Sequence, residues 1–345
     1  MQTSYISTAA LRGAPRAEIL RIQNELTDRS IEVATSRHAD VGVSLGTGTG
    51  RTVETRMDFA LIETLRVSNA SATARLSQTQ SALTDIEEVS SEMLASLVAL
   101  PPGSASARTL EIQAISSLDR VADRLNASDG GSYLFGGINS DQPPFNRFDT
   151  GPQAAVESAF LARFGVAVND PGAAAITAVD MADFLANAFA DLFNDPAWGA
   201  TWSSASYTNL VSRIDPSERI ETSTNANEEA IRKTVMGLTM IAGLGIGGLN
   251  EATRKVVTDQ AILTVGGSIT DVVALKAALG FAENAVQSAD RRMALASDIL
   301  EERIVTTERA DPVEAKVRID LLTTQLEMSF ALTNQLSRLS ILNYV

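Results

Sequence analysis

Residues 42–46, Gly-Val-Ser-Leu-Gly, have the spacing of a motif that carries a nucleophilic serine. In enzymes with this motif, the serine sits on a sharp turn between a strand and a helix, and a histidine from later in the chain takes its proton. The only histidine here is His38, which precedes Ser44 by six residues. Such a local histidine cannot complete that geometry, so we exclude a serine hydrolase. Residues 36–50 are rich in glycine, serine and threonine, and we predict a loop there.

Gly243, Gly245 and Gly248 match the G-x-G-x-x-G spacing of a dinucleotide-binding turn. That turn follows a strand, opens a helix and is paired with an acidic residue further on. Asp271 lies at a suitable distance, but residues 228–241 have the apolar spacing of a helix rather than a strand. We therefore predict a flexible joint between helices. A nucleotide-dependent enzyme is an alternative, which a thermal-shift screen with dinucleotides would reveal.

The remaining polar residues form no pattern that would hold a metal or a cofactor. With no cysteine and one histidine, a metal site would need carboxylates alone. The acidic groups have the spacing of solvated helix faces and not of a calcium loop; they include Asp85, Glu87, Glu88, Glu301 and Glu302. We predict no catalytic residue, no metal site and no cofactor, and hence a protein that is not an enzyme.

The composition favours long helices and excludes several classes of partner. Hydrophobic residues make up 45% of the 345 residues but aromatic residues only 5%, which suits helices packed through small side chains. The net charge of −14 argues against nucleic acid as a ligand. No unbroken run of about 18 apolar residues occurs, so we predict no membrane insertion. Residues 1–20 lack the charged and apolar regions of a cleaved secretory signal.

A heptad repeat from residue 65 to residue 100 predicts a long helix that supercoils with others. Its seam positions alternate in spacings of four and three: Leu65, Asn69, Ala72, Leu76, Thr79, Leu83, Ile86, Ser90, Met93, Leu97 and Leu100. The polar members weaken the seam but can fix its register. Residues 101–103, Pro-Pro-Gly, end this helix. A second helix over about residues 105–128 completes an antiparallel hairpin, with a stripe at Leu110, Ala114, Leu118, Val121 and Leu125.

Residues 132–225 differ in composition from the helical parts. Both tryptophans, Trp198 and Trp202, and most of the phenylalanine and tyrosine lie here, which predicts a small core of its own. We expect a helix over residues 180–193. We also expect a hairpin whose strands flank residues 215–217.

These patterns predict a mainly α fold. The N- and C-terminal regions form a long antiparallel helical bundle or coiled coil, and a small α/β domain is inserted between them. We expect an N-terminal assembly helix over 1–35 to pair with a C-terminal assembly helix over 312–345. A helical rod follows in two halves, 36–137 and 225–311, and an inserted variable domain covers 138–224.

The last helix, which Asp311 caps and Pro312 begins, is apolar on more than one face. One stripe runs through Val317, Leu321, Met328, Leu332, Leu339 and Leu342, and a second ridge through Ile319, Leu322, Leu326 and Phe330. An end this apolar is a liability on a free monomer, and we therefore expect neighbouring subunits to bury it. The alternative is that it packs into its own domain. Because neither end has an obvious partner core in the chain, we expect both to be protease-sensitive in the monomer. The predicted subunit-interface residues are Ile19, Ile22, Leu26, Leu321, Met328, Leu332, Leu336, Leu339 and Leu342.

The segment from Leu326 to Val345 resembles the C-terminal helix of bacterial flagellins and flagellar hook-associated proteins. Residues 133–137, Tyr-Leu-Phe-Gly-Gly, followed by Gln-Pro-Pro-Phe at 142–145, are similar to the segment after the first helical hairpin in the hook-associated protein 3 family of hook–filament junction proteins. The resemblance covers about residues 1–145 and 225–345. Residues 35–48 keep only Ser36-Arg37 of the turn typical of these families.

The resemblance implies a structural component of the bacterial flagellum, an adaptor that connects hook-associated protein 1 to flagellin as a ring of identical subunits. It also implies a flagellar export chaperone as partner, export through the flagellar type III apparatus without a cleaved signal, and an extracellular location. The nearest alternative is a flagellin that forms the filament itself. An unrelated secreted coiled-coil protein is another, and it would share the heptads but not the terminal Leu-Asn-Tyr sequence.

Overall fold

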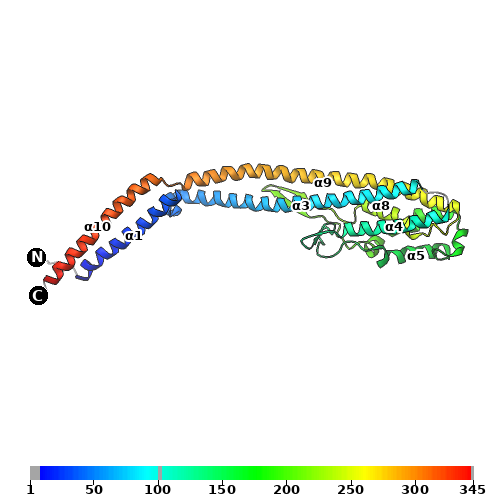
Figure 1. The fold of residues 1–345 in the computed structure, drawn as a ribbon, viewed down its shortest axis with the longest axis horizontal. Coiled ribbons are helices and arrows are strands. Elements are labelled where there is room, and N and C mark those ends of the chain that lie inside the picture. Colours follow the sequence, from blue (N-terminus) through cyan, green and yellow to red (C-terminus); the bar gives the residue numbers. More distant parts are fainter. Residues whose placement is uncertain (1–7, 100–102, 343–345) are drawn as a thin grey trace. The chain divides into compact units, whose positions relative to one another are not determined.

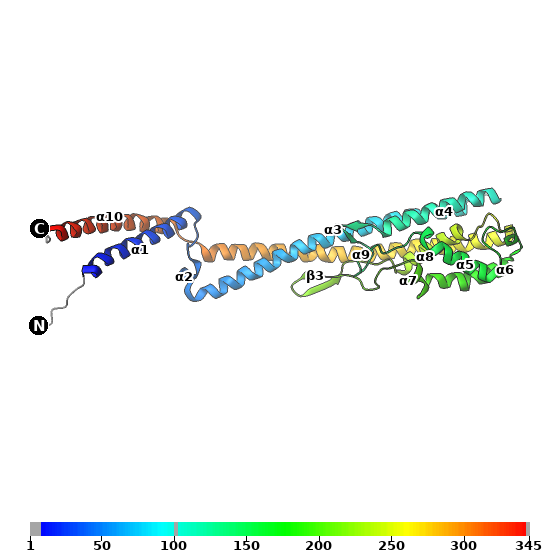
Figure 2. The same cartoon turned by 90° about the horizontal axis from the view of Figure 1, so that it is seen from below.

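The computed structural model describes residues 8–99 and 103–342, with side chains for residues 16–99, 103 and 105–335. Long helices dominate it (Figures 1 and 2): α1 (Thr8–Thr35), α3 (Thr49–Val98), α4 (Ser104–Leu125), α8 (Glu229–Gly243), α9 (Glu251–Glu308) and α10 (Pro312–Leu342). The shorter helices are α2 (Val41–Leu45), α5 (Pro152–Phe164), α6 (Ala178–Phe184) and α7 (Ala197–Thr201). Two-stranded antiparallel sheets pair β1 (Ser128–Asp129) with β2 (Ser132–Tyr133) and β3 (Val211–Asp215) with β4 (Glu218–Glu221). This confirms the mainly α fold with a small mixed insert.

The chain divides into two compact units. The terminal unit comprises residues 1–64 and 294–345, and the central unit comprises residues 65–293.

Burial confirms the heptad on α3 in the central unit. Every predicted seam position from Leu65 to Leu97 is buried, and Leu100 lies outside the described residues. The polar members find different partners. The Asn69 side-chain amide donates to the Ile214 carbonyl at 2.9 Å, whereas the Thr79 and Ser90 hydroxyls donate to carbonyls four residues earlier. Asn69 therefore holds the β3–β4 hairpin on α3.

Helix α4 packs antiparallel to α3, as predicted, and its five stripe residues from Leu110 to Leu125 are buried. Arg120 pairs with Glu92 at 2.6 Å and Arg124 pairs with Asp85 at 2.8 Å, so residue numbers rise on one helix as they fall on the other. Helix α9 is antiparallel to α3 by the same criterion. Its Lys276 lies 2.8 Å from Glu87 and its Glu283 accepts from Gln80 at 2.9 Å.

The insert has no separate core, contrary to the prediction. One continuous hydrophobic cluster joins Trp198 and Trp202 to the buried faces of α3, α4, α8 and α9. Phe148 and Val156 pack onto Gly243 of α8, and Arg232 of α8 stacks over the Trp198 ring. The helical bundle therefore forms one wall of the core that holds these aromatic rings.

The segment from Tyr133 to Gly137 contacts α3 on one side and Thr208 of the insert on the other. Arg75 of α3 donates to the Tyr133 carbonyl at 2.7 Å, and Leu134 and Phe135 are buried. Gly137 has φ +61°, and a Cβ there would lie 2.6 Å from the Thr208 carbonyl oxygen. Only glycine fits this backbone conformation and this space, so packing explains the glycine at position 137.

Other local predictions have mixed outcomes. The β3–β4 hairpin forms around residues 215–217, and residues 178–193 are helical, with one π turn and a final 3-10 turn. Residues 36–50 are not a simple loop, because Asp40 caps the short helix α2 by accepting from the Val43 N–H at 2.9 Å. The glycines at 243–248 form a turn between α8 and α9.

Helix α9 contains a stretch that is long and apolar enough to cross a membrane by length and composition, which corrects the prediction that the chain has none. Residues 264–270 interrupt this stretch with glycine, serine and threonine but no charge, so the sequence shows no unbroken apolar run there. One such helix does not establish insertion, because core helices of soluble proteins pass the same test.

Candidate assembly interface

In the terminal unit, α1 and α10 lie side by side and antiparallel (Figures 1 and 2). On α10 the side chains turned inward form an inner ridge whose spacing alternates between four and three: Ala315, Ile319, Leu322, Leu326, Ser329 and Thr333. On α1 the matching positions are Ile19, Ile22, Leu26, Arg29 and Val33. Arg318 pairs with Glu25 across the two helices at 3.2 Å. Alternating spacings of this kind are the seam of a coiled coil.

This seam separates the predicted interface residues into two groups. Ile22 is buried, and Ile19 and Leu26 are half-buried, all three on the α1 face that packs against α10 of the same chain. Leu321, Met328 and Leu332 are 47%, 54% and 59% exposed. The side chains of Leu336, Leu339 and Leu342 lie outside the described residues. The α1 side chains cover the inner ridge, so the two ends are packing partners of each other within the single chain.

The exposed residues on α10 form an outer stripe at spacings of four and seven: Val313, Val317, Leu321, Met328 and Leu332. Further large apolar side chains are exposed elsewhere in the terminal unit: Leu20 and Ile31 on α1, Val53, Met57 and Leu61 on α3, and Leu295 and Ile299 on α9. An apolar stripe of this kind that stays exposed on a helix pair marks an interaction site.

A buried carboxylate holds together the segments that join these helices. Glu308, the last residue of α9, is fully buried and accepts from Arg56 of α3 through two hydrogen bonds of 2.6 Å. Arg37 also donates to it. The hydrogen bonds from Arg56 and Arg37 hold the pKa of the Glu308 carboxyl below its usual value, against the opposing effect of burial. The backbone adds two contacts of 3.0 Å, from His38 N–H to the Glu308 carbonyl and from Ala310 N–H to the Ser36 carbonyl.

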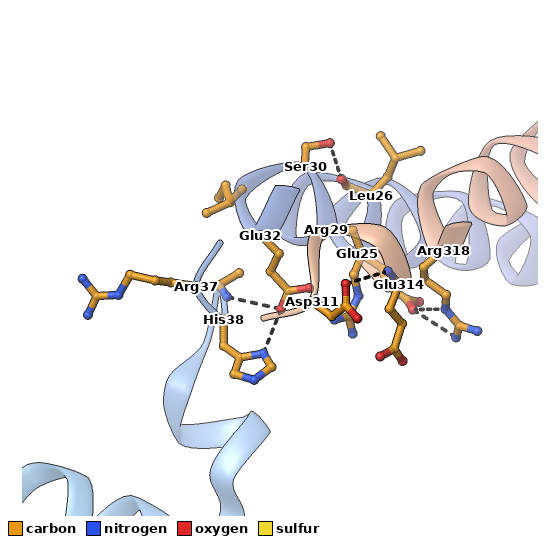
Figure 3. Close-up of polar contacts among 12 residues, drawn as sticks. Glu25, Leu26, Arg29, Ser30, Glu32, Arg37, His38, Asp311, Glu314 and Arg318 are labelled. Carbon is orange, nitrogen blue, oxygen red and sulfur yellow. Dashed lines mark hydrogen bonds and ion pairs between the residues drawn. The ribbon is translucent and has the colours of Figure 1, made fainter. Parts of the chain in front are cut away.

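A second buried carboxylate, Glu32, lies at the end of α1 (Figure 3). It accepts from Arg29 at 2.6 Å, and its other oxygen lies 3.4 Å from both His38 Nδ1 and the Ala39 N–H. Burial raises the pKa of the Glu32 carboxyl, but these hydrogen bonds outweigh it and the net shift is downward. His38 is thus a structural partner of Glu32, and Ser44 is exposed on α2.

The pattern of the sequence did not single out Glu32, Arg56 or Glu308, because isolated charged residues on helices usually face solvent. Arg37 was not singled out either, because it lies in the segment predicted to be a loop. One signal was available for Glu308. A carboxylate at a helix C-terminus opposes the helix dipole and needs a cation beside it. Among the described residues, no group of three or more His, Cys, Asp or Glu side chains could hold a metal ion.

Asp311 caps α10 as predicted, since its carboxylate accepts from the Val313 N–H at 2.8 Å. We expect Asp311→Ala to destabilise the first turns of α10 by about 1 kcal/mol, the usual cost of losing an N-cap. Hydrogen exchange over residues 313–320 should then be about fivefold faster than in the unaltered chain. Unchanged exchange there would show that the cap does not limit opening of this helix.

The comparisons with known proteins agree with this architecture. Residues 6–140 match the family model of the bacterial flagellin N-terminal helical region, and residues 262–345 match that of the bacterial flagellin C-terminal helical region. No curated protein matches the chain.

Two solved structures share the fold at low sequence identity. One is described as a flagellar hook-associated protein from Vibrio parahaemolyticus, with 10% identity and a TM-score of 0.52 over 75% of this chain and 96% of that one. The other is FlgL from Bacillus cereus, with 11% identity and a TM-score of 0.50 over 73% of this chain and 99% of that one. Since both ends of the chain match the flagellin models and together these matches span more than half of it, the chain belongs to the bacterial flagellin family.

Proposed function

We propose that this flagellar structural protein is the adaptor at the hook–filament junction, connecting hook-associated protein 1 to flagellin as a ring of identical subunits. The observation that carries the proposal is the outer stripe of α10, which remains exposed after α1 has covered the inner ridge. It lies on a helix that matches the flagellin C-terminal model. One of the two solved structures that share the fold is described as a flagellar hook-associated protein, which supports the junction position over the filament.

In this proposal, residues 1–35 and 312–345 form the assembly layer, residues 36–137 and 225–311 form the rod, and residues 138–224 form a variable surface domain. Neighbouring subunits cover the outer stripe, with Leu336, Leu339 and Leu342 extending the contact. Burying a large aliphatic side chain fully stabilises by about 1.5–3 kcal/mol, and about half of that remains to be gained for side chains that are half exposed. Several such residues per subunit make assembly favourable without any catalytic group, and we assign no enzymatic role.

The proposal includes export through the flagellar type III apparatus without a cleaved signal, with a chaperone that covers the apolar helices before export. The mature protein would then be extracellular. The terminal helices also set the protease sensitivity of the monomer. The inner ridge protects one face of each helix, so cleavage would begin where the outer stripe is exposed.

Deletion of this chain in its host tests the junction role. Cells lacking it should make hooks without filaments and release flagellin into the medium. Normal filaments in the deletion strain would contradict the proposal.

The alternative is a filament flagellin, for which the altered sequence at residues 35–48 leaves room. Purified protein would separate the two functions. A flagellin polymerises alone into long fibres, whereas a junction protein stops at short assemblies or remains monomeric. Long fibres from the pure chain would favour the alternative.

A further inference from the structure

A cleft of about 520 Å³ lies in the terminal unit between the start of α3 and the end of α9. The α3 side contributes Gly48, Arg51, Thr52 and Thr55. The α9 side contributes Arg303 and Thr307, so hydroxyl and guanidinium groups line both walls.

The two arginines of this cleft have no ion-pair partner among the residues that the structure describes. Arg29, Arg37 and Arg56 in the same unit each bind a carboxylate. Arg51 and Arg303 therefore bring two positive charges to one concave surface, against the single negative charge of Glu54.

Thr52 supplies a second, independent feature. Its side chain is 5% exposed, and its hydroxyl oxygen is buried without a hydrogen-bond partner. Helical threonines in this chain commonly donate to the carbonyl four residues earlier, as Thr55 does to Arg51 at 2.9 Å and Thr64 to Ala60 at 2.8 Å. For Thr52 that residue is Gly48, which belongs to a 3-10 turn, and the bond is not made. The cleft thus contains a buried polar group that lacks a partner.

The backbone contributes little net charge to the cleft. The positive end of the α3 dipole lies at one wall and the negative end of the α9 dipole at the other, because Arg303 and Thr307 belong to the last two turns of α9. We propose that this cleft binds an oxyanion, with Arg51 and Arg303 neutralising its charge and the Thr52 hydroxyl donating a hydrogen bond to it. The oxyanion is either a free phosphate ion or a side-chain carboxylate of another protein chain. Glu54 also lines the cleft, and its charge opposes the anion and keeps the affinity modest.

The test titrates the purified full-length chain with each anion at constant ionic strength. Binding is measured as the rise in the thermal unfolding midpoint relative to the same concentration of chloride. The probes are inorganic phosphate and, separately, N-acetylglutamate amide as a model of a protein carboxylate. We expect Arg51→Gln and Arg303→Gln each to weaken binding of the preferred probe about tenfold, the effect of losing one charge-assisted contact. Glu54→Gln should tighten it several-fold, and Thr52→Val should weaken it while leaving the shape of the wall unchanged.

Arg108→Gln is the matched control, because Arg108 is an exposed arginine on α4 without a described ion-pair partner. It should leave anion binding unchanged. Tighter binding of phosphate than of N-acetylglutamate amide identifies a free ion as the ligand, and equal or weaker binding of phosphate identifies a side-chain carboxylate. Saturation by neither probe, or an equal loss in Arg108→Gln and Arg51→Gln, would overturn the proposal.

Discussion

Leu332→Asp should abolish incorporation of this protein into the flagellum while leaving the isolated chain folded. Leu332 is 59% exposed in the single chain, so an aspartate there remains hydrated and costs the monomer little. In an assembly that covers the outer stripe, the same carboxylate would be buried without a partner. Such a group costs several kcal/mol, which corresponds to a loss of at least about 100-fold in affinity.

The measurement compares the amount of variant in sheared flagella with the helical content of the purified monomer. Asn334→Asp is the matched control, since it adds the same charge two residues away on an exposed position. That position continues the charged face of α10 that carries Lys316, Asp320 and Glu327. The control should incorporate normally. Equal incorporation of both variants would mean that the outer stripe is not a subunit contact.

Arg56→Met should destabilise the terminal unit by about 2–3 kcal/mol. The methionine keeps the apolar stem of the side chain, but Glu308 loses its two 2.6 Å hydrogen bonds and stays fully buried beside Arg37 alone. Removing one partner of a buried ion pair is costly because the remaining charge cannot be solvated, and the half-exposed position of Arg56 moderates the loss. Denaturant unfolding monitored within residues 37–64 checks this value. Arg16→Met, at an exposed arginine of the same unit without a described ion-pair partner, is the control.

The difference in free energy of unfolding between the unaltered chain and Arg56→Met should depend on pH, because the pKa of Glu308 is lowered in the folded chain. A carboxyl whose folded-state pKa is depressed contributes stability above its unfolded pKa, about 4.3, and loses it as the pH falls through the folded value. The gap in stability between the unaltered chain and Arg56→Met should therefore be full at neutral pH and should shrink below about pH 4. A gap that is constant from pH 7 to pH 3 would show that the loss is one of packing and not of charge.

Periodicity predicted the parts of this fold that depend on one helix facing another. The α3 seam and the α4 stripe could be assigned residue by residue, because a spacing of four and three fixes which side of a helix is covered. The insert was harder, since aromatic composition shows that a core exists but not which elements enclose it. Trp198 and Trp202 therefore suggested a separate core, whereas they pack into the core of the helical bundle.

The assembly surface could be predicted only in part for a similar reason. Helix α10 has two apolar ridges, and the sequence contains nothing that says which one α1 covers. The inner ridge with Leu322 is covered within the chain, and the outer stripe with Leu321 is left exposed. The partners of the carboxylates Glu32 and Glu308 could not be predicted, because they are set by how the ends of α1, α3 and α9 meet; for Glu308 the sequence offered only its place at a helix C-terminus.

The most direct test of the account uses the absence of cysteine from this chain, which allows single cysteines to be read without background. Leu321→Cys on the outer stripe and Leu322→Cys on the inner ridge are compared for reaction with a maleimide in the free monomer and in sheared flagella. We predict that Leu321→Cys reacts rapidly in the monomer and becomes protected in flagella, while Leu322→Cys is protected in both. Equal reactivity of Leu321→Cys in the monomer and in flagella would contradict the claim that neighbouring subunits cover the outer stripe.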